Sequence, residues 1–237
     1  MRLLKSKRVR VLLWVLGIWG VAAYLLAPWL WERYFGRHPS LADIPGVTQT
    51  ADGHPGDPLN IALVGSEEEI VRAMHAAGWF PADPITLRTS VRIVVDSVIK
   101  RPDDEAPVSD LFLFGRKQDL AFEQPVGDSP RQRHHVRFWK TTKQEIGEPV
   151  WIGSATFDIR VGVSYTTGEV THHIGPDVDA ERDRISSELR QAGWADEAYV
   201  VNGFHPTLSG RNGGGDPWRT DGRLTVVVLR PPNPDTG

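Results

Sequence analysis

One uncharged stretch, from Val11 to Trp31, most constrains what this chain can fold into. As a helix rising about 1.5 Å per residue, it is long enough to cross a hydrocarbon core of roughly 30 Å. Five basic residues precede it and fewer follow closely. The positive-inside rule therefore predicts a basic cytoplasmic tail over residues 1–10, a transmembrane helix over residues 11–31, and an exported remainder.

The alternative is a cleaved signal peptide, which the basic start and the small pair Ala22-Ala23 would allow. The apolar stretch exceeds the roughly 7–15 residues of a signal core and continues beyond that pair. We therefore predict an uncleaved anchor in the plasma (inner) membrane. Pro28 should kink or end the helix near its outer end.

The part beyond the anchor is acidic and lacks cysteine. The chain holds 27 Lys and Arg against 30 Asp and Glu, and without the five basic residues of the tail the balance becomes 22 against 30, a charge of −8. This charge is a poor match for nucleic acid, so we expect no nucleic-acid partner. The missing cysteines exclude disulfides, a thiol nucleophile and Cys-ligated zinc.

Proline and glycine divide the exported part. They are dense over residues 32–58, which predicts an extended spacer before a domain over residues 59–230. Residues 205–222 hold a glycine-rich run that predicts a flexible loop, and the proline-rich residues 231–237 predict a disordered tail.

Two similar strand–helix units are predicted within the domain. In the first, a strand at 61–64 leads to the capping box of Ser66 and Glu69, and the helix ends at Gly78-Trp79. In each unit the glycine should adopt a left-handed conformation that lets the following tryptophan fold back on the helix.

The second unit repeats this order, with a strand at 171–174, a helix starting at Asp177 and an end at Gly193-Trp194. A third helix is predicted after Ser90 from apolar residues at helical spacing. Alternating polar and apolar residues predict strands at 111–114, 119–123, 134–139 and 151–163, and an apolar run predicts another at 224–229. The expected fold is α+β, a mostly antiparallel sheet with two or three packing helices, preceded by one N-terminal transmembrane helix.

Two adjacent histidine pairs, His134-His135 and His172-His173, are the main candidates for chemistry. Neighbours on a strand point to opposite faces, so each pair offers at most one imidazole to a given face. A site across strands could join His135 to Asp158 and to His172 or His173.

Further candidates for such a site are Arg133, Arg137 and Glu123. Imidazoles with carboxylates suit acid–base work or a divalent metal, although no metal-binding spacing is present and no cofactor is otherwise expected. The alternative is that these residues form the solvated, salt-bridged face of a half-covered sheet.

Asp177 is the first acidic residue of a dense polar segment, and its sequence context allows two roles. A carboxylate in the first turn of a helix caps free N–H groups, and Arg182 can pair with Asp179 one turn away. Asp177 could also orient the imidazole of His173. The capping role is favoured over direct catalysis.

Three blocks resemble the LssY C-terminal domain family: residues 133–139 (Arg-His-His-Val-Arg-Phe-Trp), 151–158 and 171–183. Phe114-Gly-Arg116 with residues 118–123 resembles a fourth block, which adds Arg116 to the candidate binding residues. The resemblance runs from about Pro58 to about Phe204 and implies a bacterial membrane-associated domain without an established activity. No catalytic residue carries over from it.

In that family the domain often follows membrane segments related to lipid phosphatases, whereas this chain has one anchor only. His173 and Asp177 have the spacing that ends the lipid-phosphatase signature, but Tyr165-Thr166-Thr167 stand where its Ser and Arg should be. We therefore reject that enzyme identity.

Two functions remain. The first is an exported accessory module of the cell envelope that binds a ligand, an envelope protein or a lipid partner without turnover. The second is a hydrolase, metal-assisted in one version, acting on phosphoesters or lipids through His135, Asp158, His172 or His173, and Asp177.

Overall fold

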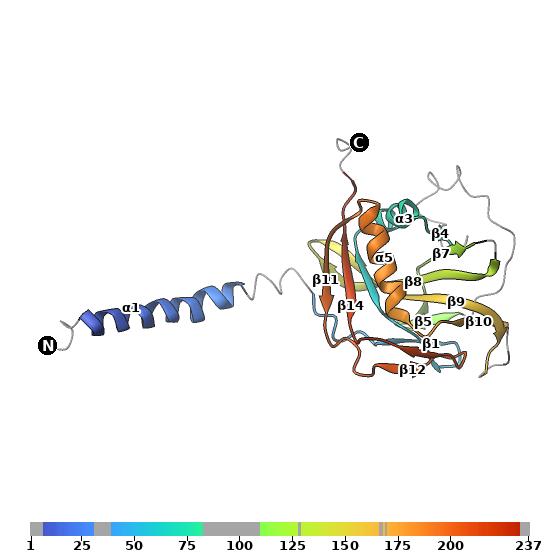
Figure 1. The fold of residues 1–237 in the computed structure, drawn as a ribbon, viewed down its shortest axis with the longest axis horizontal. Helices are drawn as coiled ribbons and strands as arrows, with labels where there is room; N and C mark the ends of the chain where they lie inside the picture. The colour runs from blue at the N-terminus through green and yellow to red at the C-terminus, as the bar shows by residue number, and fades with distance from the viewer. Residues whose placement is uncertain are drawn as a thin grey trace. The chain divides into compact units, whose positions relative to one another are not determined.

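The computed structural model of the protein describes residues 7–30, 39–82, 110–127, 129–165, 168 and 170–232. The chain divides into two compact units, Met1–Ser40 and Leu41–Gly237, and each is described by itself (Figure 1). The helix predicted after Ser90 and residues 233–237 of the predicted tail lie outside the described residues.

The first unit contains one apolar helix. It comprises α1 (Lys7–Val21), a π-helical segment η2 (Ala22–Leu26) and further helical residues to Leu30. By length and composition it could cross a membrane, and its apolar side chains are exposed. The helix continues past Pro28 to Leu30, so of the predicted kink or end at this residue the end is wrong. Proline has no N–H for the preceding turn, and a widened π turn is one way in which a helix accommodates this loss.

The second unit is built on an eight-stranded sheet. Its strands are β3 (Ile61–Val64), β4 (Phe80–Pro81), β7 (Leu120–Val126), β8 (Ser129–Glu145), β9 (Glu148–Val163), β10 (Val170–Ile174), β11 (Ala195–Val201) and β14 (Leu224–Leu229). The order is β11-β14-β3-β9-β8-β7-β4, with β10 paired to β9. Every pair is antiparallel except β14 with β3. This confirms the predicted α+β class with a mostly antiparallel sheet.

Two helices, α3 (Glu67–Ala76) and α5 (Val178–Gln191), pack on one face of this sheet (Figure 1). The capping box of Ser66 and Glu69 is present at the start of α3, as predicted. Trp79 donates its backbone N–H to Met74 at the end of α3 over 2.9 Å, and Gly78 before it has φ +84°. These bonds form the predicted left-handed helix end.

The helix α5 ends in the same way as α3. Trp194 donates its backbone N–H to Leu189 over 2.9 Å, and Gly193 has φ +76°. The tryptophans that follow both glycines join one apolar core between the helices and the sheet, which also contains Ile185. The Trp79 indole donates to Glu188 of α5 over 2.8 Å, so the two predicted units are joined directly.

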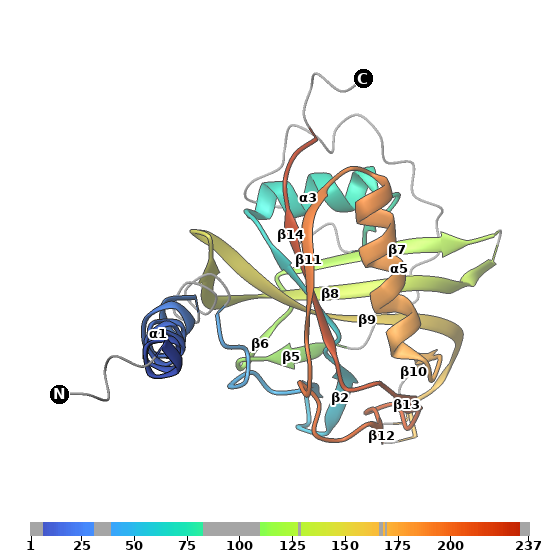
Figure 2. The same cartoon turned by 60° about the vertical axis from the view of Figure 1, so that its left-hand side comes forward.

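The opposite face of the large sheet carries a second layer. This layer is a four-stranded sheet ordered β2-β1-β5-β6, whose strands are β1 (Val47–Thr50), β2 (Pro55–Pro58), β5 (Leu111–Leu113) and β6 (Arg116–Lys117). A separate hairpin is formed by β12 (Ser209–Arg211) and β13 (Pro217–Arg219). Figure 2 shows β2, β5 and this hairpin at the opposite end of the view from α3.

Two predictions are wrong in this layer. The spacer predicted over 32–58 contains two strands, and Leu41 and Ile44 are buried in a second apolar core on this face. The flexible loop predicted over 205–222 contains the β12–β13 hairpin. Pro55 and Pro58 lie in β2, the edge strand of its sheet, where a missing N–H breaks no central ladder.

Candidate functional site

The alternation along β8 separates two environments, as predicted. His134 faces α5 and binds Glu181, with 2.7 Å between its Nδ1 and Oε2. Arg133, His135 and Arg137 lie on the opposite face, because successive side chains on a strand alternate. His135 and Arg137 are buried there, so the interpretation of a solvated sheet face is wrong. The second layer covers polar side chains that the sequence analysis allowed to be in water.

Arg133 holds two carboxylates together on this face. Its Nε donates to Oδ2 of Asp158 over 3.0 Å, and its Nη1 donates to Oε2 of Glu123 over 2.8 Å. Asp158 lies opposite Arg133 in the β8–β9 register, and Glu123 comes from β7. The sequence predicted these three residues as site candidates, and the structure brings them together.

Arg137 forms a second buried ion pair, with Asp57 of β2. Arg137 Nη1 lies 3.6 Å from Asp57 Oδ2, and both side chains are less than one-tenth exposed. The side-chain amide of Asn212, at the tip of the β12–β13 hairpin, donates to Asp57 Oδ1 over 2.9 Å. Asp57 thus connects the small sheet, the large sheet and the hairpin. Sequence reasoning missed Asp57 and Asn212 because it assigned them to a spacer and a loop.

His172 of β10 completes the cluster. Its Nδ1 lies 3.4 Å from Asp158 Oδ2, and its side chain is only 4% exposed. Within the part of the chain that the structure describes, neither ring nitrogen of His172 has a hydrogen-bond partner. Buried polar groups are nearly always hydrogen-bonded, so this imidazole is an exception that calls for a physical reason.

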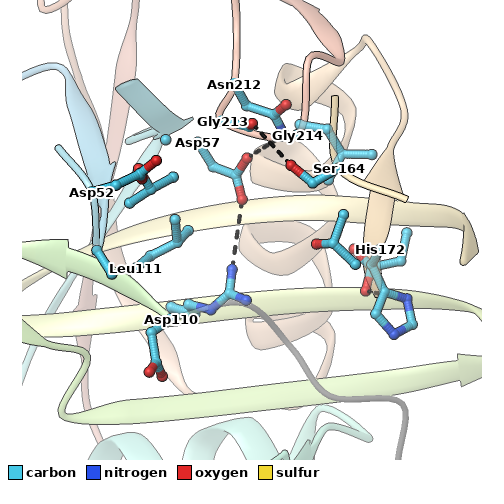
Figure 3. A pocket seen from close by; sticks show the side chains of 16 residues that line it. Asp52, Asp57, Asp110, Leu111, Ser164, His172, Asn212, Gly213 and Gly214 are labelled. Carbon is cyan, nitrogen blue, oxygen red and sulfur yellow. Dashed lines mark hydrogen bonds and ion pairs between the residues drawn. The ribbon is translucent and has the colours of Figure 1, made fainter. Parts of the chain in front are cut away.

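A cavity of about 360 Å³ opens beside these residues. Its charged and histidine lining comprises Asp52, Asp57, Asp110, Arg137, Asp158 and His172. Figure 3 shows Asp52 and Leu111 on one side of the cavity, Ser164 and His172 on the other, and Asp57 below the loop from Asn212 to Gly214. The hairpin and the small sheet therefore form walls that the large sheet alone could not provide.

Burial changes the protonation of this lining. Desolvation raises the pKa of Asp158 to about 6, although the charge of Arg133 opposes the change. Desolvation also lowers the pKa of His172 to about 4, with further lowering by Arg133 and Arg137. The pKa of Asp57 is raised by burial against the opposing charge of Arg137. The cavity thus presents a neutral imidazole near pH 7 beside a carboxyl group that titrates close to neutrality.

His135 lies on the same face as the cluster but is absent from the cavity lining. Burial lowers its pKa well below the usual value, and Arg137 and Arg133 add to the effect. His135 is therefore a neutral group behind the lining.

His173 faces away from its neighbour His172, as strand alternation requires. Its Nδ1 lies 2.7 Å from Oδ1 of Asp216, which follows the hairpin tip. A Cβ added at Gly162 would lie 2.6 Å from Nε2 of the same ring, so the imidazole is tightly enclosed. His173 thus fastens the hairpin to β10, and Asp216 rather than Asp177 is its partner.

Asp177 and Arg182 make contacts that stabilise the fold. Asp177 accepts a hydrogen bond from the backbone of Ala180 and caps α5, as favoured from the sequence, and it also pairs with Arg219. Arg182 is buried and binds Asp179, as predicted. It binds Asp221 as well, at 2.8 and 3.1 Å.

Arg116 pairs with Asp119 outside the cavity lining. None of Asp177, Arg182 and Arg116 lines the cavity. Within the described residues, no three His, Cys, Asp or Glu side chains converge as a metal-ligand set. A metal-assisted reaction therefore stays a prediction with no site assigned to it.

The comparisons with known proteins agree with the resemblance. A family described as LssY C-terminus matches residues 41–224. The chain belongs to this family. The match includes both strands that the sequence analysis assigned to a spacer, as well as the β12–β13 hairpin, so the LssY C-terminal domain contains every wall of the cavity. No curated protein and no solved structure matches the chain.

Proposed function

We propose that the LssY C-terminal domain of this chain binds a small polar ligand in the cavity between the small sheet and the β12–β13 hairpin. The observation that carries the proposal is His172, which lines the cavity and is 4% exposed. Among the described residues neither of its ring nitrogens has a hydrogen-bond partner, although Asp158 Oδ2 lies 3.4 Å from its Nδ1. Leaving such a group unpaired costs about 1–3 kcal/mol. A ligand that bonds to the imidazole would remove that cost.

The shape and charge of the site support this proposal. Its volume of about 360 Å³ falls at the small end of the roughly 300–1,000 Å³ range of ligand pockets. Asp57 and Arg137 are fixed by each other and by Asn212, so the polar groups are positioned before a ligand arrives. Preorganised groups lose little freedom on binding, which favours affinity.

We also propose the location of this binding module. The five basic residues before the apolar helix favour a cytoplasmic N-terminus, which supports a domain outside the inner membrane that acts as an accessory of the cell envelope. The exposed apolar side chains of the helix support retention as an anchor. A reporter fused after Gly237 should be active only outside the cytoplasm, and cytoplasmic activity would contradict the orientation.

Calorimetric titration of the full chain tests ligand binding. The chain is kept in polyoxyethylene detergent and titrated separately with N-acetylglucosamine, choline and inorganic phosphate, which represent neutral, cationic and anionic ligands. We expect heat of binding with one class, and at least tenfold weaker binding in His172→Asn. The matched control His75→Asn replaces an exposed histidine on α3 and should bind as the natural chain does. If none of the three probes binds, or if His172→Asn binds unchanged, the proposal is contradicted.

A hydrolase is the second candidate, and the pair of Asp158 and His172 is the observation that favours it. A carboxyl group with a pKa of about 6 can donate a proton near neutral pH, and a neutral imidazole 3.4 Å away can accept one. The test is a panel of phosphomonoesters and phosphodiesters. Turnover lost in Asp158→Asn and retained in His75→Asn would support the enzyme, whereas no turnover in the natural chain would contradict it.

A further inference from the structure

The cavity lining points to a particular chemical class of ligand. We propose that it binds a neutral, hydroxyl-rich molecule, a sugar or polyol. This proposal rests on the proposed function, because it assigns a ligand to the same cavity.

The charges of the lining disfavour an anion. Arg137 is the one arginine or lysine among the lining residues, and it is paired with Asp57, so a phosphate or carboxylate would have to compete with that carboxylate for it. The second arginine of the cluster, Arg133, is held by Asp158 and Glu123.

The same charges offer little to a cation. Asp57 is paired with Arg137, Asp158 with Arg133, and Asp110 with Lys117. The fourth lining aspartate, Asp52, accepts a hydrogen bond from the hydroxyl of Thr50 and lies 3.4 Å from Nε2 of His54. A cationic ligand would have to compete with the arginines and the lysine for three of the four carboxylates. A neutral ligand needs no such exchange.

Hydroxyl groups match the hydrogen-bonding character of the lining. Carboxylates such as that of Asp57 accept hydrogen bonds, whereas guanidinium and amide groups such as those of Arg137 and Asn212 donate them. A sugar hydroxyl can do both at once. The neutral ring of His172 offers one donor and one acceptor, and both nitrogens lack hydrogen-bond partners among the described residues. Two neighbouring hydroxyls of a sugar could satisfy this buried imidazole.

Saturation-transfer NMR of the full chain tests the ligand class. The chain is kept in polyoxyethylene detergent, which contains no sugar, phosphate or quaternary amine. Glucose, N-acetylglucosamine and myo-inositol are the probes, with choline and inorganic phosphate as comparison ligands. We expect transfer to at least one of the hydroxyl-rich probes, which Asp57→Asn should abolish or strongly reduce.

Val163→Ala is the matched control for Asp57→Asn, since Val163 is 59% exposed on β9 and outside the lining. This variant should give the same saturation transfer as the natural chain.

The possible results separate this proposal from the one on which it rests. Binding of choline or phosphate without any hydroxyl-rich probe would overturn the assigned class and leave a ligand-binding cavity. Absence of binding by every probe would overturn both proposals. Sugar binding that Asp57→Asn leaves unchanged would show that the sugar binds outside this cavity and would overturn the assigned ligand class.

Discussion

His134 and His135 are neighbours in the sequence, yet the sheet gives them opposite surroundings, and His172 and His173 repeat the contrast. His134 and His173 each have a carboxylate 2.7 Å away, and these contacts fasten α5 and the hairpin to the sheet. Desolvation lowers the pKa values of His135 and His172, and the nearby charges of Arg133 and Arg137 lower them further. One imidazole of each pair therefore supports the fold, and the other belongs to the polar cluster beside the cavity.

The same contrast holds for the two faces of the large sheet. The face under α3 and α5 buries an apolar core with Ile185 and Trp194, which stabilises the fold. The other face buries a second apolar core in one region. In another region it buries the ion pairs of Asp57 with Arg137 and of Asp158 with Arg133. Buried ion pairs contribute little net stability once desolvation is counted, so their arrangement is better explained by a site than by the fold.

The largest expected effect comes from breaking one buried pair. Arg137→Met leaves Asp57 buried without its cation and should lower the free energy of unfolding by about 3–5 kcal/mol. Denaturant unfolding followed by tryptophan fluorescence measures this change.

The control for this variant is Arg116→Met, which breaks the more exposed pair with Asp119 and should change stability by no more than about 1 kcal/mol. Adding Asp57→Asn to Arg137→Met should recover part of the loss. Equal losses in the two arginine variants would contradict the contrast between the cavity cluster and the surface.

We expect Asp158 and His172 to change the free energy of unfolding with opposite dependences on pH. The pKa of Asp158 is raised from 3.8 to about 6, so its contribution is fully present below pH 4 and is lost as the pH rises to 6. The pKa of His172 is lowered from 6.5 to about 4, so its contribution is present above pH 6.5 and is lost as the pH falls to 4. The two contributions oppose each other in the natural chain.

Single variants separate these two contributions. As the pH rises from 4 to 6, the free energy of unfolding of Asp158→Asn should increase relative to that of the natural chain, by on the order of 2 kcal/mol. Over the same rise, that of His172→Asn should decrease relative to the natural chain by a similar amount. Unfolding curves at several pH values measure both slopes, and His75→Asn serves as the exposed control. Slopes of the same sign in the two variants would contradict the assigned pKa values.

A smaller effect is expected at the helix ends that the two units share. Gly193→Ala places a Cβ at φ +76° with no neighbour nearer than 3.8 Å, so the loss of about 1 kcal/mol reflects backbone strain rather than a clash. Gly78→Ala, at φ +84°, should lose a similar amount. Thermal unfolding measures both, and a stabilised variant would show that the left-handed helix end is absent.

Local patterns in the sequence predicted much of the fold. The capping box at Ser66 and the glycine–tryptophan helix ends follow from short-range chemistry, and the alternation in β8 and β9 gave the correct faces. The family resemblance was confirmed by the match over residues 41–224. The caps, helix ends and strand faces depend on residues near one another in the chain, so short sequence patterns are enough to predict them.

The cavity could be predicted only in part. Arg133, Arg137, Asp158 and His172 were candidates because they lie on strands with clear alternation. Asp57 was not, because its strand contains two prolines and pairs only at a sheet edge. Its contacts with residue 137 and with residue 212 join distant parts of the chain, and no local pattern encodes such pairings.

The most direct test of the central claim is nitrogen-15 NMR of the histidine rings in the full chain during titration with glucose, N-acetylglucosamine or myo-inositol, whichever gives saturation transfer. The account predicts that the ring signals of His172 shift on binding, whereas those of His134 and His173 stay in place because carboxylates already hold them. If the signals of His172 do not move, or if all three rings move alike, the division between a fold-supporting and a ligand-binding histidine is contradicted.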